Sequence, residues 1–316
     1  MLTHTKDTIA MLWRNSRSVI FGRNQDLQSE VDLAFTGAHD IAVVRRLTGG
    51  GAVFHDLGNV NYTFIAPHDG GRVADFKDFA RPLIAALYRM GVTAELSGRN
   101  DLLVEGLKIS GCAHTRLKDR ALYHGTLLFD ANLGDMAGAL KVNRAKYESK
   151  GIASVASRVG NLARLMNTPE HPMNVEDFMA RLRQELLADG HFEAIPFTME
   201  ETAAIDKLCA EKYTNMAWTD GGWRGLEKRG QARTAGGTVE AWVTVAKGRI
   251  SHARLTGDFF GVTPVSEVEA LLIGLPYERE AVSTALPDAL LSTALMNVPK
   301  DALLDVLFAP VNADAD

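Results

Sequence analysis

The chain has 316 residues, of which 46% are hydrophobic and 23% charged, and this composition excludes a largely disordered protein. Its formal net charge of -5 argues against nucleic acid as the main partner, because phosphate backbones attract basic surfaces, but it leaves room for a local basic pocket. No apolar run is long enough for a transmembrane helix, and the two cysteines have neither disulfide nor zinc spacing, so we expect a cytoplasmic protein.

Short strands and one long helix dominate the prediction for the first 130 residues. Strands are expected at Ile9–Trp13, Val19–Phe21, Ile41–Val44, Asn61–Ile65, Leu102–Val104, Ile109–Ala113 and Ala121–Phe129. A weak helical pattern covers Leu27–Phe35, and a clear period of 3.6 residues predicts a helix over Val73–Met90. Strands and helices do not alternate as in a doubly wound fold, so an α+β class is predicted.

Helices become more frequent after residue 133. Amphipathic helices are predicted over Val175–Leu187 and Thr198–Tyr213, and the Gly- and Trp-rich stretch Asn215–Gly230 is interpreted as a linker. The last section is expected to contain strands at Thr238–Ala246 and Ile250–Leu255, then helices at Val265–Ile273, Glu280–Leu286 and Lys300–Leu307. We therefore predict two domains, residues 1–215 and residues 230–316.

The most informative stretch is the glycine-rich loop that follows the strand at Ile41–Val44. Three consecutive glycines, Gly49–Gly51, follow Arg45 and Arg46. Glycine loses much conformational entropy on folding, so such a run favours a backbone that closely approaches a ligand or adopts positive φ. With two arginines it indicates a loop around an anionic or phosphorylated ligand. A plain flexible hairpin explains the glycines equally well, and the spacing fits neither a P-loop nor a dinucleotide fingerprint.

Polar residues downstream offer a second candidate site. Lys108 begins a strand of small residues, so its ammonium could hold a carboxylate or a phosphate, although solvated lysines are commoner. Asn100 and Asp101 could bind a phosphate-bound Mg²⁺ or simply form a turn. In a regular strand Cys112 could share a face with Lys108, the kind of cationic neighbour that activates a thiol. The two residues would be about 13 Å apart, so a nucleophilic Cys112 is only a minor alternative.

Ordered blocks of this sequence resemble the lipoate–protein ligase family. The segment from Arg45 to Asn59 looks like its RRxxGGGxVxHDxGN signature. Further blocks that match in the same order are Gly98–Asp101, Lys108–Gly111, His124–Thr126, Ser154–Leu162 (an SVxSRVxNL element) and Gly257–Gly261 (part of a small C-terminal domain). The resemblance extends from about Leu12 to Leu286, so it covers most of the chain.

This resemblance implies a mixed β-sheet catalytic domain, shared with biotin ligases, and a small α/β C-terminal accessory domain. It implies that lipoate and ATP, with Mg²⁺, first form lipoyl-AMP and pyrophosphate. A carrier lysine then attacks the mixed anhydride and releases AMP. The carriers implied are apo lipoyl domains of 2-oxoacid dehydrogenase E2 subunits and the glycine-cleavage H protein, and the enzyme is expected to be a monomer that serves lipoate salvage.

The resemblance also assigns roles to individual residues. Lys108 would lie between the lipoate carboxyl group and the α-phosphate as the catalytic residue. Expected ATP contacts are Phe21, Arg46, Gly51, Ala52, Val53, Phe54, Asn100, Asp101 and Lys108. Expected lipoate contacts are Trp13 (at the far end of an apolar tunnel), Arg46, Gly50, Gly51, His55, Lys108 and His124. No metal site made by the protein alone is predicted.

The sequence departs from the family pattern in three places, and two alternatives stay open. The family's first strand and its helix with an FNLAxE-type segment are expected to be absent; Trp218–Gly222 only faintly matches the linker motif; and Cys112 replaces a usual serine. One alternative is an octanoyl or lipoyl transferase that uses a cysteine thioester, although such enzymes usually lack the C-terminal domain. The other is a non-catalytic lipoate-binding protein. A biotin ligase is a weaker option, because its glycine motif differs.

Overall fold

The computed structural model describes residues 7–68, 76–98, 100–117, 119–141, 159–168, 171–188, 190, 192–221 and 226–310. Contacts within the chain divide it into two compact units. Unit 1 contains Met1–Ile20, Glu30–Val44 and Val53–Lys212, and unit 2 contains Phe21–Ser29, Arg45–Ala52 and Tyr213–Asp316. The glycine-rich loop thus groups with unit 2, whereas Lys108 lies in unit 1. The domain boundaries at residues 215 and 230 stay a prediction.

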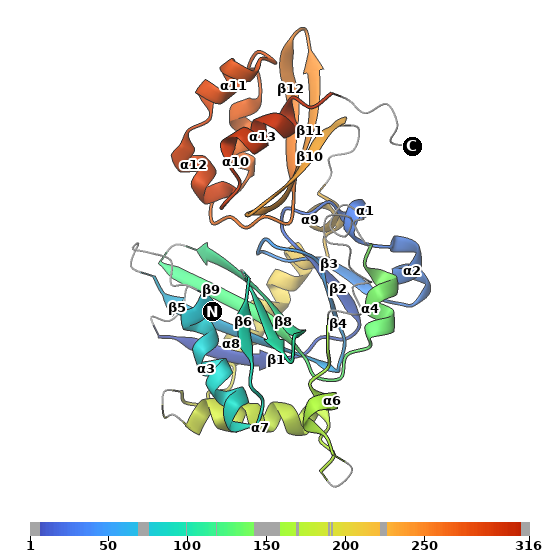
Figure 1. Ribbon diagram of the computed structural model, residues 1–316, viewed down its shortest axis with the longest axis vertical. Coiled ribbons are helices and arrows are strands. Elements are labelled where there is room, and N and C mark those ends of the chain that lie inside the picture. Colours follow the sequence, from blue (N-terminus) through green and yellow to red (C-terminus); the bar gives the residue numbers. More distant parts are fainter. Residues whose placement is uncertain are drawn as a thin grey trace. The chain divides into compact units, whose positions relative to one another are not determined.

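A six-stranded sheet forms the centre of unit 1 (Figure 1). In spatial order its strands are β1 (Ile9–Trp13), β5 (Asn59–Pro67), β9 (Arg120–Leu128), β8 (Leu107–Leu117), β7 (Asp101–Val104) and β6 (Glu95–Ser97). Neighbouring strands pair antiparallel, and an isolated parallel bridge joins Lys108 to Val159. Antiparallel sheets whose strands do not alternate regularly with helices confirm the predicted α+β class.

Two helices pack together beside this sheet and complete the core of unit 1. They are α3 (Phe76–Arg89) and α7 (Val175–Ala188), and Arg89 joins them by a 2.7 Å ion pair with Glu185. Their apolar residues recur every three or four positions, which places them on one helix face. The shared core includes Tyr62, Phe64, Leu83, Leu87, Tyr123, Leu127, Phe178 and Leu182. Each such leucine contributes about 1.5–3 kcal/mol when fully buried.

The remaining segments of the first 213 residues are short. A second sheet has the order β3 (Ala42–Arg45), β2 (Ser18–Phe21) and β4 (Val53–His55). The helices are α1 (Leu27–Glu30), α2 (Leu33–Ala38), α4 (Leu133–Ala139), α6 (Ala163–Met166) and α8 (Met199–Leu208), and a π-helical turn follows at Cys209–Tyr213. The single helix predicted over Leu27–Phe35 is wrong, because the Asp32 side chain accepts a hydrogen bond from the Phe35 N–H and starts a new helix there.

Unit 2 contains an antiparallel sheet with helices on one side of it (Figure 1). The strands are β10 (Lys228–Thr234), β11 (Gly237–Ala246) and β12 (Arg249–Gly257), and the helices after them are α10 (Ser266–Leu272), α11 (Arg279–Ala285), α12 (Asp288–Ala294) and α13 (Lys300–Leu307). α13 packs on β10 and β11, and α10 packs on β12. Helix α9 (Met216–Asp220) and the start of β10 occupy described parts of the stretch interpreted as a linker, so this stretch contains regular structure.

The helices of both units are short. Across the described ranges, none combines the length and the apolar character that crossing a bilayer requires.

Candidate functional site

One face of the six-stranded sheet carries the polar residues that the sequence analysis singled out. Asn61 pairs with Trp13 on one side and with Thr126 on the other, and Thr63 pairs with His124. Opposed residues in antiparallel strands point to the same face, and alternate residues of one strand do so too. This face, called the site face below, therefore presents Trp13, Asn61, Thr63, Asp101, Lys108, Gly111, His124 and Thr126. Tyr62 and Tyr123 point to the opposite face and into the core.

A β-bulge determines which face Lys108 occupies. Leu102 pairs with Ser110, but the next residue, Leu103, pairs with Lys108. Ile109 is therefore an extra residue in β8, which shifts the alternation by one. Regular alternation would place Lys108 on the core face with Ser110, whereas the bulge places it on the site face. The expectation that Lys108 and Cys112 could share a face is therefore wrong.

The side chain of Lys108 extends along the site face. Its Nζ atom lies 2.8 Å from Oδ1 of Asp101, and both side chains are about one-third exposed. A methyl group placed on Gly111 would lie 3.2 Å from this Nζ atom, so glycine provides the room that the ammonium needs. The backbone of Lys108 is held by the Gly160 N–H, which donates to its carbonyl at 3.0 Å. Lys108 is thus a positioned cation that a ligand can still reach.

Cys112 lies on the core face, where it is 4% exposed. Tyr62 lies against it, with its hydroxyl 3.3 Å from Ser110 Oγ. Burial raises the pKa of Tyr62 well above its ordinary value, and Cys112 contributes to the shift. Burial also lowers the pKa of His114, so no imidazolium is favoured next to the thiol. These surroundings do not favour a reactive thiolate.

Trp13, which belongs to the site face, lies against His55 of β4 in unit 1. The Trp13 indole N–H donates to Thr63 Oγ1 at 3.0 Å, and the Trp13 and His55 rings meet edge to face at 6.1 Å. Nδ1 of His55 lies 3.1 Å from the Asn15 amide nitrogen. These contacts fix the orientation of both rings, which were predicted to contact lipoate.

Sequence reasoning missed Asn61 as a site residue. Asn61 is 1% exposed, its Oδ1 accepts a hydrogen bond from the Asn59 amide at 3.0 Å, and its Nδ2 has no partner within the described ranges. A buried amide donor without a partner is costly, so it is a natural contact for a bound polar group. The alternation of polar and apolar residues from Asn59 to Phe64 was a signal that could have identified this residue.

The glycine-rich loop folds back on itself within unit 2. Arg46 donates from Nε to Thr48 Oγ1 at 2.9 Å and from Nη2 to the Gly49 carbonyl at 2.6 Å. Gly50 has a φ of 90°, and a Cβ on Gly22 would lie 2.0 Å from the Gly50 carbonyl oxygen. Gly50 and Gly22 are thus required by positive φ and by close backbone packing, whereas a Cβ on Gly51 would meet nothing within 4 Å.

Arg45 does not serve the loop in the way that its sequence suggested. Its guanidinium donates to backbone carbonyls of Gly22, Arg23, Gln25, Trp218 and Thr219. It also lies 4.5 Å above the Phe21 ring, which is fully buried. The guanidinium donors of Arg45 thus already bind the protein, and a part for Arg45 in holding an anionic ligand stays a prediction.

The structure brings the predicted residues together in two groups. In unit 1, the site face carries Trp13, Asp101, Lys108 and His124. Asn100 lies beside this face, because its Nδ2 donates a 2.7 Å hydrogen bond to the Cys112 carbonyl. The same unit contains Val53, Phe54 and His55 in β4. Unit 2 contains Phe21, Arg46, Gly50, Gly51 and Ala52. Arg99 and residues 154–158 of the matching blocks lie outside the described residues. The ligand contacts of both groups stay predictions.

Comparison with protein families gives two matches. Residues 1–187 match the model described as the lipoyl protein ligase A/B catalytic domain, and residues 226–307 match the bacterial lipoate protein ligase C-terminus. Lipoate-protein ligase LplJ of Bacillus subtilis is 38% identical over 301 residues, which cover 94% of this chain and 90% of that protein. Lipoate–protein ligase 1 of Staphylococcus aureus is 38% identical over 283 residues, covering 90% and 85% of the two chains.

Solved structures agree in fold. Plasmodium falciparum LipL1 in complex with lipoate covers 96% of this chain with a TM-score of 0.73 and 24% identity, and 86% of that chain is covered. A lipoate-protein ligase A bound with ATP has a TM-score of 0.58 and 26% identity over 68% of this chain and 86% of its own. A bipartite lipoate protein ligase from Thermoplasma acidophilum, described in a structural analysis of the ligase and its E2 lipoyl domain, has a TM-score of 0.58 and 28% identity over 69% of this chain and 86% of that chain.

Proposed function

Because the chain belongs to the lipoate–protein ligase family, we propose that its site face activates lipoate with ATP for transfer to a carrier lysine. The enzyme is an ATP-dependent ligase of lipoate and protein. The observation that carries the assignment of the site is the position of Lys108. This residue presents a cation, paired with Asp101, on a sheet face that also contains Trp13 and His124.

In the first half-reaction, a lipoate carboxylate oxygen attacks the α-phosphorus of ATP, and the bond to pyrophosphate breaks. Both reactants are anions, so they repel each other, and negative charge grows on the phosphoryl oxygens in the transition state. The Lys108 ammonium reduces the repulsion when it lies between the carboxylate and the α-phosphate. Asp101, at 2.8 Å, limits the positions that the ammonium can take, which preorganises it for this task.

In the second half-reaction, the amine of a carrier lysine attacks the carbonyl carbon of lipoyl-AMP. The C–O bond to AMP breaks, the nitrogen loses a proton, and an amide forms. The adenylate already carries an activated carboxyl group, so no covalent enzyme intermediate is needed. This agrees with the burial of Cys112 on the core face.

Trp13 supports lipoate binding at the apolar end of the substrate. The indole ring offers an apolar surface for the aliphatic tail and the dithiolane ring. Its N–H donates to Thr63 and its ring edge contacts His55, so its orientation is set before the ligand binds. The carboxyl end would then extend along the site face toward Lys108.

A magnesium ion would neutralise charge on the ATP phosphates. Mg²⁺ commonly uses one or two protein carboxylates and completes its shell with phosphate oxygens and water. Asp101 is about one-third exposed and offers the carboxylate, with the Asn100 amide oxygen beside it. Among the described residues no three His, Cys, Asp or Glu side chains gather into a metal site, so the phosphates would supply most of its ligands.

The protein substrates that we propose are apo lipoyl domains of 2-oxoacid dehydrogenase E2 subunits and the glycine-cleavage H protein. The support is that the related Thermoplasma acidophilum ligase is described together with its E2 lipoyl domain. The monomeric state and the cytoplasmic location stay predictions.

The direct test is pyrophosphate release from the purified chain with ATP, magnesium and lipoate, with and without an apo lipoyl domain. The intact mass of that domain is then measured. Lipoate-dependent release together with a lipoyl mass increase supports the ligase. Transfer from an octanoyl carrier without ATP supports the transferase instead, and lipoate binding without either reaction supports the binding protein.

Cys112→Ser is expected to leave both half-reactions within about twofold of the wild type. The residue faces the core rather than the site face, and serine can replace the thiol beside Tyr62 with a change of less than about 1.5 kcal/mol in stability. Rates of pyrophosphate release and of lipoyl transfer check this. Complete loss of transfer in a folded variant would instead favour the cysteine-thioester transferase.

Gly111→Ala is expected to slow adenylate formation by roughly 10–100-fold while the fold persists. The added methyl group would lie 3.2 Å from Lys108 Nζ, and the end of the flexible lysine side chain would shift to make room. The measurement is single-turnover pyrophosphate release. Gly37→Ala is the matched control, because a Cβ at Gly37 meets nothing within 4 Å. Equal rates for the two variants would contradict the position assigned to Lys108.

A further inference from the structure

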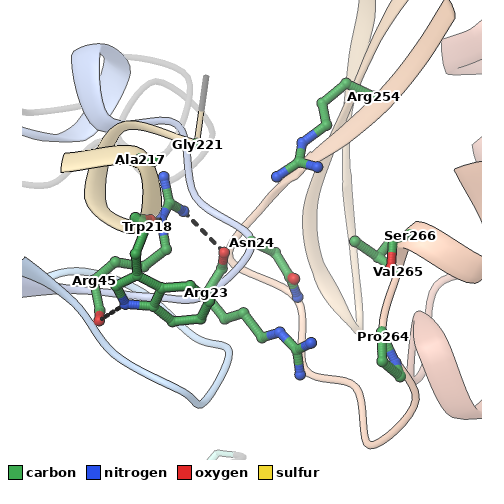
Figure 2. A pocket seen from close by; sticks show the side chains of 10 residues that line it. All are labelled: Arg23, Asn24, Arg45, Ala217, Trp218, Gly221, Arg254, Pro264, Val265 and Ser266. Atoms are coloured by element: carbon green, nitrogen blue, oxygen red, sulfur yellow. Dashed lines mark hydrogen bonds between the residues drawn. The ribbon is translucent and has the colours of Figure 1, made fainter. Parts of the chain in front are cut away.

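A pocket within unit 2 is lined by cationic and amide groups. It has a volume of about 240 Å³, and its lining includes Arg23, Asn24, Arg45 and Arg254 but no aspartate or glutamate. Figure 2 shows the guanidinium groups of Arg23 and Arg254 and the amide of Asn24 directed toward the same space. Arg23 and Asn24 come from the loop after β2, and Arg254 comes from β12.

Several donors in this pocket lack partners within the described residues. The Arg23 guanidinium makes no hydrogen bond or ion pair there. Asn24 is 8% exposed, and only its backbone carbonyl is bonded, to the Gly257 N–H at 2.9 Å. Arg254 contacts Glu269 through Nη1 at 3.3 Å, while its buried Nε has no partner. The buried Arg254 Nε has no acceptor, which is costly, and Arg23 is only partly buried, so a ligand that brings acceptor atoms can reach these groups.

The charge balance in the pocket also favours an anion. Burial, and then the charge of Arg254, lower the pKa of Arg23 below its ordinary value. The same two causes lower the pKa of Arg45 to about 10, although Asp26 and Asp220 act in the opposite direction. A ligand with negative charge would relieve this repulsion. The guanidinium donors of Arg45 already bind backbone carbonyls, so Arg45 contributes positive charge and a fixed part of the pocket wall but no hydrogen bonds to the ligand.

We propose that this pocket binds a phosphate-type oxyanion through Arg23, Asn24 and Arg254, none of which is among the residues of the site face. Guanidinium and amide groups match the tetrahedral oxyanions of phosphate in geometry and in donor character. The ligand is either free inorganic phosphate or the pyrophosphate that adenylate formation releases. Only the second source rests on the proposed function.

The test is isothermal titration calorimetry of the full chain, without ATP or lipoate, using inorganic phosphate in one series and pyrophosphate in the other. Arg23→Gln is expected to raise Kd at least tenfold, which corresponds to about 1.4 kcal/mol. Asn24→Leu is expected to raise it at least threefold. Neither side chain makes a hydrogen bond within the described residues, so both variants are expected to fold, and thermal unfolding verifies this. Arg279→Gln, on α11, removes the same charge from the same unit and serves as the control.

Weakening in both series supports a general phosphate site, and weakening with pyrophosphate alone supports a site for the reaction product. The proposal is overturned if the wild type binds neither anion, or if Arg23→Gln and Asn24→Leu bind as tightly as Arg279→Gln. Pyrophosphate held at the site face alone would give this second result. Lipoyl transfer is measured separately, so failure of the pocket proposal stays distinguishable from failure of the ligase assignment.

Discussion

Lys108→Ala is expected to reduce the rate of lipoyl-AMP formation by about 10²–10³-fold, the range seen when one preorganised group is removed from a transition-state site. The reason is electrostatic, because the carboxylate and the α-phosphate would meet without a cation between them. Stability should change little: the ion pair with Asp101 is about one-third exposed, and such pairs contribute at most about 1 kcal/mol. The measurement is pyrophosphate release in a single turnover, with thermal unfolding as the check on folding.

Lys77→Ala provides the control for this experiment. Lys77 is exposed on α3, away from the site face, so its loss should leave the rate unchanged. Transfer from pre-formed lipoyl-AMP should be less affected in Lys108→Ala than its formation, because that step starts from an activated carboxyl group. A folded Lys108→Ala enzyme that releases pyrophosphate at a near-normal rate would falsify the role proposed for the lysine.

Arg45→Met is expected to destabilise unit 2 by about 3–5 kcal/mol, the range typical when a buried charged partner is removed. Arg45 is 3% exposed, and its guanidinium satisfies carbonyls from the loop after β2 and from α9. Each buried carbonyl left without a donor costs about 1–3 kcal/mol, and partial relaxation makes the sum smaller than additivity gives. The measurement is urea denaturation followed by tryptophan fluorescence, to which Trp218 and Trp242 of this unit contribute.

Arg279→Met is the matched control for that measurement. Arg279 forms a surface ion pair with Asp305, and both side chains are largely exposed, so we expect a change below about 1 kcal/mol. If Arg45→Met unfolds at the same urea concentration as Arg279→Met, then the hydrogen bonds of Arg45 do not hold the loop in place.

Much of the fold could be predicted from local patterns. These patterns are the apolar periodicity of α3 and α7 and the strand-like runs from Ile9 to Phe129. They depend only on residues that are near in sequence, so one sequence is enough to detect them. The faces of β8 could not be predicted in this way. Alternation assumes a regular ladder, whereas the bulge at Ile109 arises from pairing with β7, which is a tertiary property.

The roles of the two arginines could likewise not be predicted from residue type alone. Arg45 and Arg46 are adjacent and chemically identical, yet one binds backbone carbonyls of two distant segments and the other closes its own loop. The family resemblance was more informative about Lys108, because it rests on ordered blocks rather than on one residue. Asn61 was missed because the alternation of polar and apolar residues in β5 predicts a strand but matches no functional motif.

The bulge in β8 also sets a rule for moving this lysine and glycine into another protein. Lys108 and Gly111 are three residues apart, an odd spacing that would put them on opposite faces of a regular strand. The intervening Ile109 is fully buried in the core cluster, so the residue that creates the irregularity also anchors it. Transfer of the pair to a regular antiparallel sheet therefore also requires the β-bulge and a set of apolar core residues that bury the side chain of the bulged residue. Copying the lysine and glycine alone would turn the ammonium toward the interior.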